Sequence, residues 1–71
     1  MSTYTVRYAD SGLRIIVDAE TSLEAARAVA DVMQPAEPVV VRVANHDGVT
    51  VEIRVEAVKT WRAVMIGLVE P

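Results

Sequence analysis

Residues 21–33, TSLEAARAVADVM, are the one stretch of the chain that has the period of a helix. Apolar side chains recur there at helical offsets and form a single stripe, while the charged side chains fall elsewhere. The stripe consists of Leu23, Ala26, Val29, Ala30 and Met33. Because an apolar stripe has to be buried and the rest of the chain alternates like β-structure, this stretch predicts one helix packed on a sheet.

The predicted helix has a start signal and a stop signal. Thr21 is the expected N-cap, because its hydroxyl can accept a hydrogen bond from the amide of Glu24, and Glu24 can reach back in a capping box. Pro35 and Pro38 follow the helix, and neither residue can continue it.

Four other segments alternate apolar and polar residues, as half-buried strands do. They are residues 3–9, 13–18, 39–44 and 51–55. Residues 57–69 are rich in β-branched and aromatic residues, so we expect a strand there as well. Four apolar residues of this segment also recur at helical offsets, which keeps a helix as the alternative. These are Val58, Trp61, Met65 and Leu68.

The turns predict the register of two hairpins. A four-residue first loop brings the apolar residues of both strands to one face, and it sets Arg7 opposite Arg14 on the other face. That like-charge pair is unfavourable unless neighbours compensate it. A three-residue second turn with Gly48 in the left-handed region sets Arg42 opposite Glu52, a complementary pair worth ~0.2–1 kcal/mol.

These elements predict a single α+β domain over residues 1–71, a two-layer sandwich of one helix on an antiparallel sheet of four to five strands. The expected order is ββαββ with a fifth strand at the C-terminal end. The order of the strands within the sheet stays open, since the crossover after the helix has more than one solution. The face of the sheet away from the helix is open, and it carries Arg7, Arg14, Arg42 and Arg54 with acidic neighbours.

The chain offers little for catalysis or metal binding. It has no cysteine and one histidine, His46, which argues against disulfides, a zinc site and a nucleophilic triad. His46 and Asp47 lie where the second hairpin turns, so we interpret them as turn residues. Glu52 and Glu56 are interpreted as part of a solvated face. We therefore expect no enzyme, no catalytic residue, no metal ligand and no cofactor.

Charge and aromatic content argue against direct binding of nucleic acid. Ten acidic and seven basic residues give a formal net charge of −3. Four arginines on the open face suggest a platform for RNA or another anion, but Tyr4 and Tyr8 are expected to point into the core, where they cannot stack on bases.

Neither a signal peptide nor a membrane span is expected. The chain has no cationic segment followed by an apolar one at its start, and its longest apolar run, residues 63–69, is too short to cross a bilayer. We therefore expect a soluble cytoplasmic protein without contact to a membrane.

Three successive segments carry a resemblance to known proteins: YTVRY at 4–8, GLRIIV at 12–17 and DAETSLEAA at 18–26. Together they resemble a strand, strand, helix module that is common in small proteins of phages and mobile elements. In size, acidity and lack of a site the chain is also similar to the anti-CRISPR proteins. That resemblance implies a protein that binds and blocks a host defence complex, with acidic surface where nucleic acid would dock.

The first hypothesis is therefore a non-enzymatic interaction protein, a phage-type inhibitor whose carboxylates occupy a basic nucleic-acid-binding surface of a host complex. Its candidate contact residues are Glu20, Glu24, Asp31, Glu37, Glu52 and Glu56. One alternative is a small domain of a larger assembly, monomeric or homodimeric, that self-associates through an open strand edge or an apolar C-terminal segment around Trp61, Met65 and Leu68. The other alternative is the arginine platform for an anion or RNA.

Overall fold

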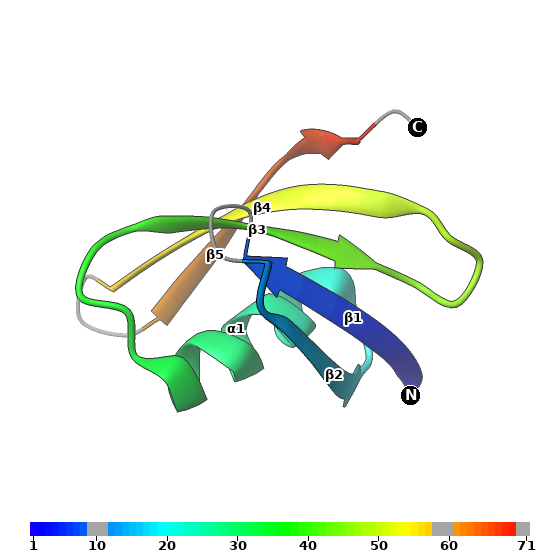
Figure 1. Cartoon of the computed structure of the whole chain (residues 1–71), viewed down its shortest axis with the longest axis horizontal. Coiled ribbons are helices and arrows are strands. Elements are labelled where there is room, and N and C mark those ends of the chain that lie inside the picture. Colours follow the sequence, from blue (N-terminus) through cyan, green and yellow to red (C-terminus); the bar gives the residue numbers. More distant parts are fainter. Residues whose placement is uncertain (9–11, 58–60, 70–71) are drawn as a thin grey trace.

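The chain forms a layer of five strands and a layer of one helix in the computed structural model, which describes residues 1–8, 12–57 and 61–69 (Figure 1). The elements are β1 (Ser2–Tyr8), β2 (Arg14–Ala19), α1 (Ser22–Met33), β3 (Val39–Ala44), β4 (Thr50–Ala57) and β5 (Trp61–Leu68). Their order in the sheet is β2-β1-β3-β4-β5, and all neighbours are antiparallel. The α+β class is confirmed, whereas the order along the chain is ββαβββ, with the helix between the second and third of five strands.

Helix α1 begins and ends as its sequence predicts. The Glu24 amide donates to Thr21 Oγ1 at 3.2 Å, which makes Thr21 the N-cap. The carboxylate of Glu24 makes no described hydrogen bond back to Thr21, so only half of the capping box forms. At the other end Gln34 adopts a left-handed conformation with φ of 46°, and its amide donates to the Ala30 carbonyl at 2.8 Å.

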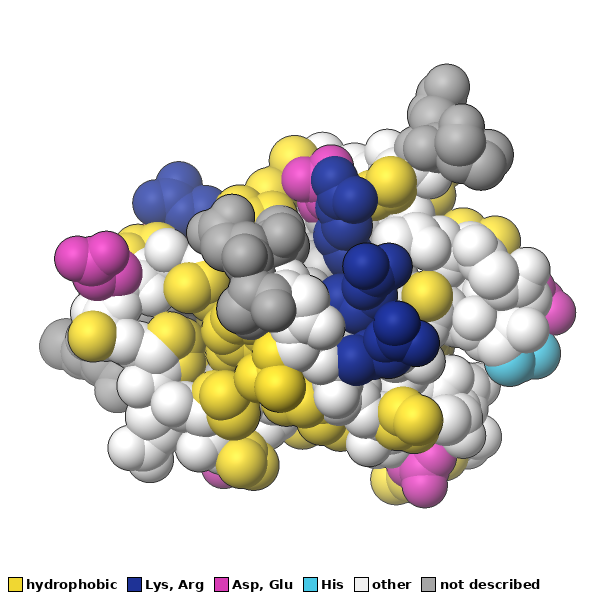
Figure 2. Space-filling view, viewed as in Figure 1, with side chains coloured by type: hydrophobic (Ala, Val, Ile, Leu, Met, Phe, Trp, Pro, Cys, Tyr) yellow, Lys and Arg dark blue, Asp and Glu magenta, His cyan; other side chains and the backbone are white. Residues whose placement is uncertain are grey.

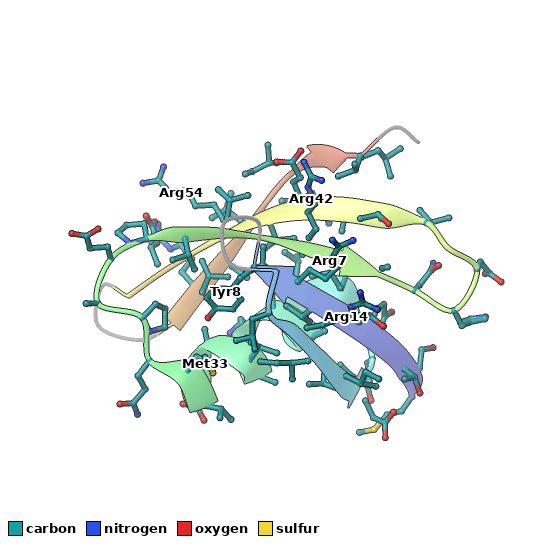
Figure 3. All side chains as sticks on the ribbon, in the orientation of Figure 1. Arg7, Tyr8, Arg14, Met33, Arg42 and Arg54 are labelled. Atoms are coloured by element: carbon teal, nitrogen blue, oxygen red, sulfur yellow. The ribbon has the colours of Figure 1, made fainter. Side chains whose placement is uncertain are left out.

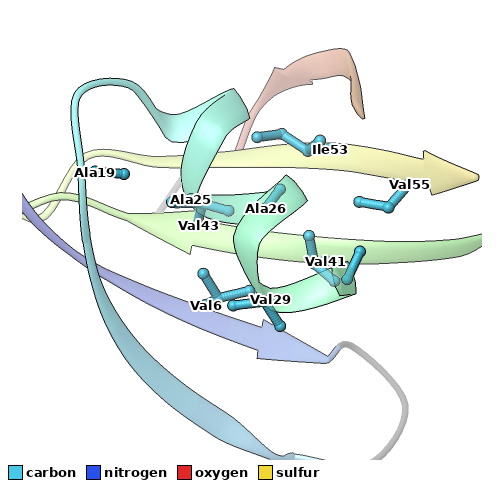
Figure 4. Close-up of a cluster of buried hydrophobic side chains, with 10 residues drawn as sticks. Val6, Ala19, Ala25, Ala26, Val29, Val41, Val43, Ile53 and Val55 are labelled. Carbon is cyan, nitrogen blue, oxygen red and sulfur yellow. The ribbon is translucent and has the colours of Figure 1, made fainter. Parts of the chain in front are cut away.

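The core lies between α1 and the covered face of the sheet and is built from small side chains (Figure 4). Three of its helix residues are alanines, which let the helix backbone approach the sheet closely. The prediction for Met33 was wrong, since this residue of the last turn is 41 % exposed and Ala25 takes a buried position instead. The buried residues are Val6, Ala19, Ala25, Ala26, Val29, Ala30, Val41, Val43, Ile53 and Val55.

Both hairpin registers are confirmed. Arg7 lies opposite Arg14, and Arg42 lies opposite Glu52. Gly48 has φ of 84°, as the three-residue turn requires. The crossover through α1 then places β3 beside β1, which answers the question that the sequence leaves open.

The C-terminal segment, for which the sequence allowed a strand or a helix, forms strand β5. Its pairing with β4 shifts register between Glu52 and Ile53, so that Ile66 is an extra residue in β5.

Within the described part of the chain, α1 has neither the length nor the apolar character to cross a membrane.

Candidate functional site

Three arginines form a straight row across the open face of the sheet. Arg7 of β1 lies directly opposite Arg14 of β2 on one side and directly opposite Arg42 of β3 on the other. We call Arg14, Arg7 and Arg42 the arginine row. On β4 the row ends at Glu52. Figure 3 shows the three labelled side chains one after another, and Figure 2 shows Lys and Arg side chains as a continuous dark-blue column on this face.

The hydrogen-bond pattern of the sheet tells how closely the row is spaced. The Tyr8 amide donates to the Leu13 carbonyl at 3.0 Å, so this pair is hydrogen-bonded and the next pair, Arg7 and Arg14, is not. Non-hydrogen-bonded partners have Cα atoms about 4.5 Å apart, and the hydrogen-bonded pair of Arg7 and Arg42 about 5.5 Å. The Cα atoms of the three arginines therefore lie on one line about 10 Å long.

The arginine row has no acidic partner in the described part of the chain. None of its three side chains takes part in an ion pair or a side-chain hydrogen bond there, although Glu52 lies opposite Arg42. All three side chains are exposed. The row therefore presents its guanidinium donors to solvent, and each guanidinium can bind a carboxylate or phosphate in bidentate fashion.

The fourth arginine predicted for this face belongs to a different arrangement. Arg54 lies 3.4 Å from a carboxylate oxygen of Glu56, and Arg62 of β5 lies 3.8 Å from the other oxygen. Glu56 is half-buried between them, and its one negative charge offsets one of their two positive charges. Arg62 was missed at the level of sequence, because its place on the open face depends on residues 57–69 being a strand in register with β4.

The six predicted acidic contact residues do not form one surface. Glu24 and Asp31 lie on exposed positions of α1, on the opposite side of the molecule from the open face, while Glu52 and Glu56 lie half-buried on that face. Two more exposed carboxylates flank the helix in the chain: Glu20 before it and Glu37 after it.

The second hairpin turn carries no sign of a reactive site. The side chains of His46 and Asp47 are 3.4 Å apart and both largely exposed. The Asn45 side chain holds the turn by accepting from the amides of Asp47 at 2.9 Å and Val49 at 3.0 Å. Among the described residues no group of His, Asp and Glu side chains is arranged to hold a metal ion.

The aromatic side chains that the structure describes, Tyr4 and Tyr8, lie on the covered side of the sheet. Tyr4 and Tyr8 pack against the core, and burial raises the pKa of the Tyr8 phenol above its usual value of 10.0. The side chain of Trp61, predicted to take part in self-association, lies outside the described part of the chain. Met65 and Leu68 of β5 are 43 % and 71 % exposed, so both are accessible at that edge of the sheet.

Comparison of the chain with models of protein families, with curated proteins and with solved structures gives no match.

Proposed function

We propose that the protein is a non-enzymatic binding module that holds an acidic partner protein on the open face of its sheet through the arginine row. The observation that supports this most is the direct opposition of Arg14, Arg7 and Arg42 on three adjacent strands with no ion pair among the described residues. An arrangement of this kind suits a ligand that brings its own negative charges.

The energetics of the sheet support a binding role for the row. Like charges directly opposite each other destabilise a pair of strands, and Arg7 takes part in two such pairs. The chain as a whole is acidic, with a net charge of −3, so the row is a local concentration of positive charge on an acidic protein. Natural proteins break such local rules of stability at functional sites.

The surroundings of the row favour carboxylates of a protein over a single-stranded nucleic acid. Proteins that bind unpaired bases stack them on exposed aromatic rings, and the described aromatic side chains, Tyr4 and Tyr8, pack on the other side of the sheet. The row also runs across the strands over a short distance, which fits a few carboxylates better than a long phosphate backbone.

Fluorescence anisotropy with labelled dodecaglutamate tests the proposal, with a labelled RNA oligonucleotide in parallel. We expect dodecaglutamate to bind at low salt and to dissociate as salt rises, because exposed charges are screened. Arg7→Glu should weaken binding by about tenfold or more, since one charged hydrogen bond is worth about 1.5–3 kcal/mol.

Arg27→Glu is the matched control, because Arg27 is an exposed residue of α1 and the substitution makes the same change in net charge. Equal loss of affinity in both variants would contradict a site at the arginine row. Tighter binding of RNA than of dodecaglutamate would overturn the choice of an acidic protein partner.

The phage-type inhibitor is the second candidate function, and the exposed carboxylates on α1 and next to it in the chain favour it. Glu20, Glu24, Asp31 and Glu37 are exposed and form no ion pair among the described residues, so they are free to contact a basic surface. In this proposal the protein acts in the cytoplasm and blocks the nucleic-acid-binding surface of a host complex, as anti-CRISPR proteins do.

A pull-down from host lysate at low and high salt separates the two candidates. The inhibitor should retain a basic nucleic-acid-handling complex at low salt only, and Asp31→Lys should reduce that retention while Arg7→Gln leaves it unchanged. Retention that depends on Arg7 and not on Asp31 would contradict the inhibitor.

A further inference from the structure

The free edge of β2 can pair with the same edge of a second copy, because its exposed residues are complementary to themselves in antiparallel order. β2 is the outermost strand of the sheet beside β1, and its pairing with β1 has no register shift (Figure 1). Because the Leu13 carbonyl accepts from Tyr8, alternation turns the N–H and C=O groups of Arg14, Ile16 and Asp18 away from β1. These groups are open to pairing with another strand.

The side chains of the same three residues lie on the open face. Ile16 is 69 % exposed and lies between the two charged residues on this face. Asp18 accepts a hydrogen bond from Thr3 Oγ1 at 2.8 Å through one carboxylate oxygen, which leaves the other oxygen available. Arg14 has no ion-pair partner in the described part of the chain.

We propose that β2 pairs antiparallel with β2 of a second copy of the chain, around a two-fold axis through Ile16. In this register Arg14 lies opposite Asp18 of the second copy, and Ile16 lies opposite Ile16. On the covered side, the half-buried Ile15 lies opposite the half-buried Val17 of the second copy. Each position meets a complementary one, as a two-fold interface requires.

Charge selects this arrangement over its competitors. An in-register parallel pairing of the two β2 strands, with both open faces on the same side, would bring Arg14 beside Arg14 and Asp18 beside Asp18 of the second copy, which is unfavourable. The other edge, β5, is interrupted by the extra residue Ile66, and interruptions of this kind protect an edge from strand addition. Of these pairings, only the antiparallel pairing of β2 places Arg14 opposite a carboxylate of the second copy.

The interface is small, and the dimer is therefore reversible. A pair of six-residue strands buries less than the ~800 Å² per partner of a standard stable interface. Since the two-fold axis is perpendicular to the sheet, both open faces lie on the same side of the dimer. This inference does not rest on the proposed function, because it concerns the edge of β2 and needs no anionic ligand. The dimer contact uses Arg14 and leaves Arg7 and Arg42 of the row to a ligand.

Charge reversal at the two ends of the interface tests the register. Sedimentation velocity over a series of concentrations should show a monomer–dimer equilibrium for the natural chain. Arg14→Asp opposes two carboxylates and Asp18→Arg opposes two guanidinium groups, so each variant alone should be monomeric. An equimolar mixture of the two variants should form a mixed dimer, and the double variant R14D/D18R should dimerise with itself.

Ile16→Pro tests the backbone pairing without a change of charge. Proline removes an N–H that faces away from β1, which an edge strand tolerates, so the variant should fold and remain monomeric. Ile16→Thr keeps the N–H and should still dimerise. Circular dichroism checks that each variant is folded.

A natural chain that stays monomeric at every concentration would overturn the proposal. So would dimers that persist in Arg14→Asp or Ile16→Pro, or an equimolar mixture of the two charge variants that remains monomeric.

Discussion

At the scale of single residues, Arg7 is the position where folding and the proposed binding oppose each other. It lies between Arg14 and Arg42, and no described carboxylate offsets its charge. Arg7→Gln removes two like-charge pairs and should raise the free energy of unfolding by about 0.5–1 kcal/mol in low salt. Urea denaturation measures this gain, which should shrink at high salt because the repulsion is then screened.

Arg27→Gln is the control for this prediction. Arg27 lies three residues after Glu24 and four before Asp31 on the exposed side of α1, so its charge is favourable to the helix. Its removal should leave stability unchanged or lower it slightly. A gain as large as that of Arg7→Gln would mean that any lost arginine stabilises this chain and that the row has no special strain.

Tyr8 gives the fold a dependence on alkaline pH. Burial raises the pKa of its phenol above 10.0, so the folded chain keeps a proton that the unfolded chain releases. This contribution to stability is complete below pH 10 and is lost as the pH rises towards the folded pKa. Urea denaturation from pH 9 to 11 should show a steeper decline for the natural chain than for Tyr8→Phe. A Tyr4→Phe variant should keep the steep decline, and an identical decline in Tyr8→Phe would contradict the assignment.

At the scale of elements, α1 depends on small residues against the sheet. Ala26 is enclosed by the core, whereas Ala28, on the same helix, is exposed. Ala26→Leu forces a larger side chain between helix and sheet and should cost about 1–3 kcal/mol in the free energy of unfolding. Ala28→Leu adds the same atoms in solvent and should have little effect. Equal effects on the urea midpoint would show that the helix does not pack at Ala26 as described.

Local patterns predicted the elements wherever one period dominated. The two hairpins combine a period of two with turn residues that allow one loop length, so the pairs Arg7–Arg14 and Arg42–Glu52 followed from the sequence. The last strand was ambiguous for a physical reason. Its extra residue, Ile66, puts Met65 opposite Ile53 and Leu68 opposite Val51. Met65 and Leu68 are three residues apart and yet lie on the same face of the sheet, which imitates a helical offset.

The candidate site depended on information that local patterns do not hold. Arg42 joins Arg7 only because the crossover through α1 places β3 beside β1, and this choice is made by the packing of the whole core. The sequence put Arg54 in the same group, but Arg54 and Arg62 both form ion pairs with Glu56. The face of the sheet on which each arginine lies was therefore predictable from the alternation of the strands. The arginine row and its lack of acidic partners were not, because they depend on which strands are neighbours in the assembled sheet.

At the scale of the whole molecule, the proposed dimer would make the open face a bivalent site. Asp18 of the second copy neutralises Arg14 and leaves Arg7 and Arg42 free in each copy. With strands ~4.8 Å apart and a rise of ~3.3 Å per residue, the two Arg7 residues lie about 20 Å from each other on one side of the dimer. An extended chain of about six residues covers this distance, so one long acidic segment can contact both copies.

The length of an acidic ligand should therefore matter more to the dimer than to the monomer. Dodecaglutamate spans both Arg7 sites and gains from effective concentration, whereas tetraglutamate reaches one site only. Anisotropy titrations at protein concentrations that populate the dimer should give a larger affinity ratio between the two peptides for the natural chain than for Ile16→Pro. The proline variant keeps all arginines, so its ratio measures the statistical advantage of the longer peptide. If both proteins give the same ratio, the two copies do not bind one ligand together, even where sedimentation shows a dimer.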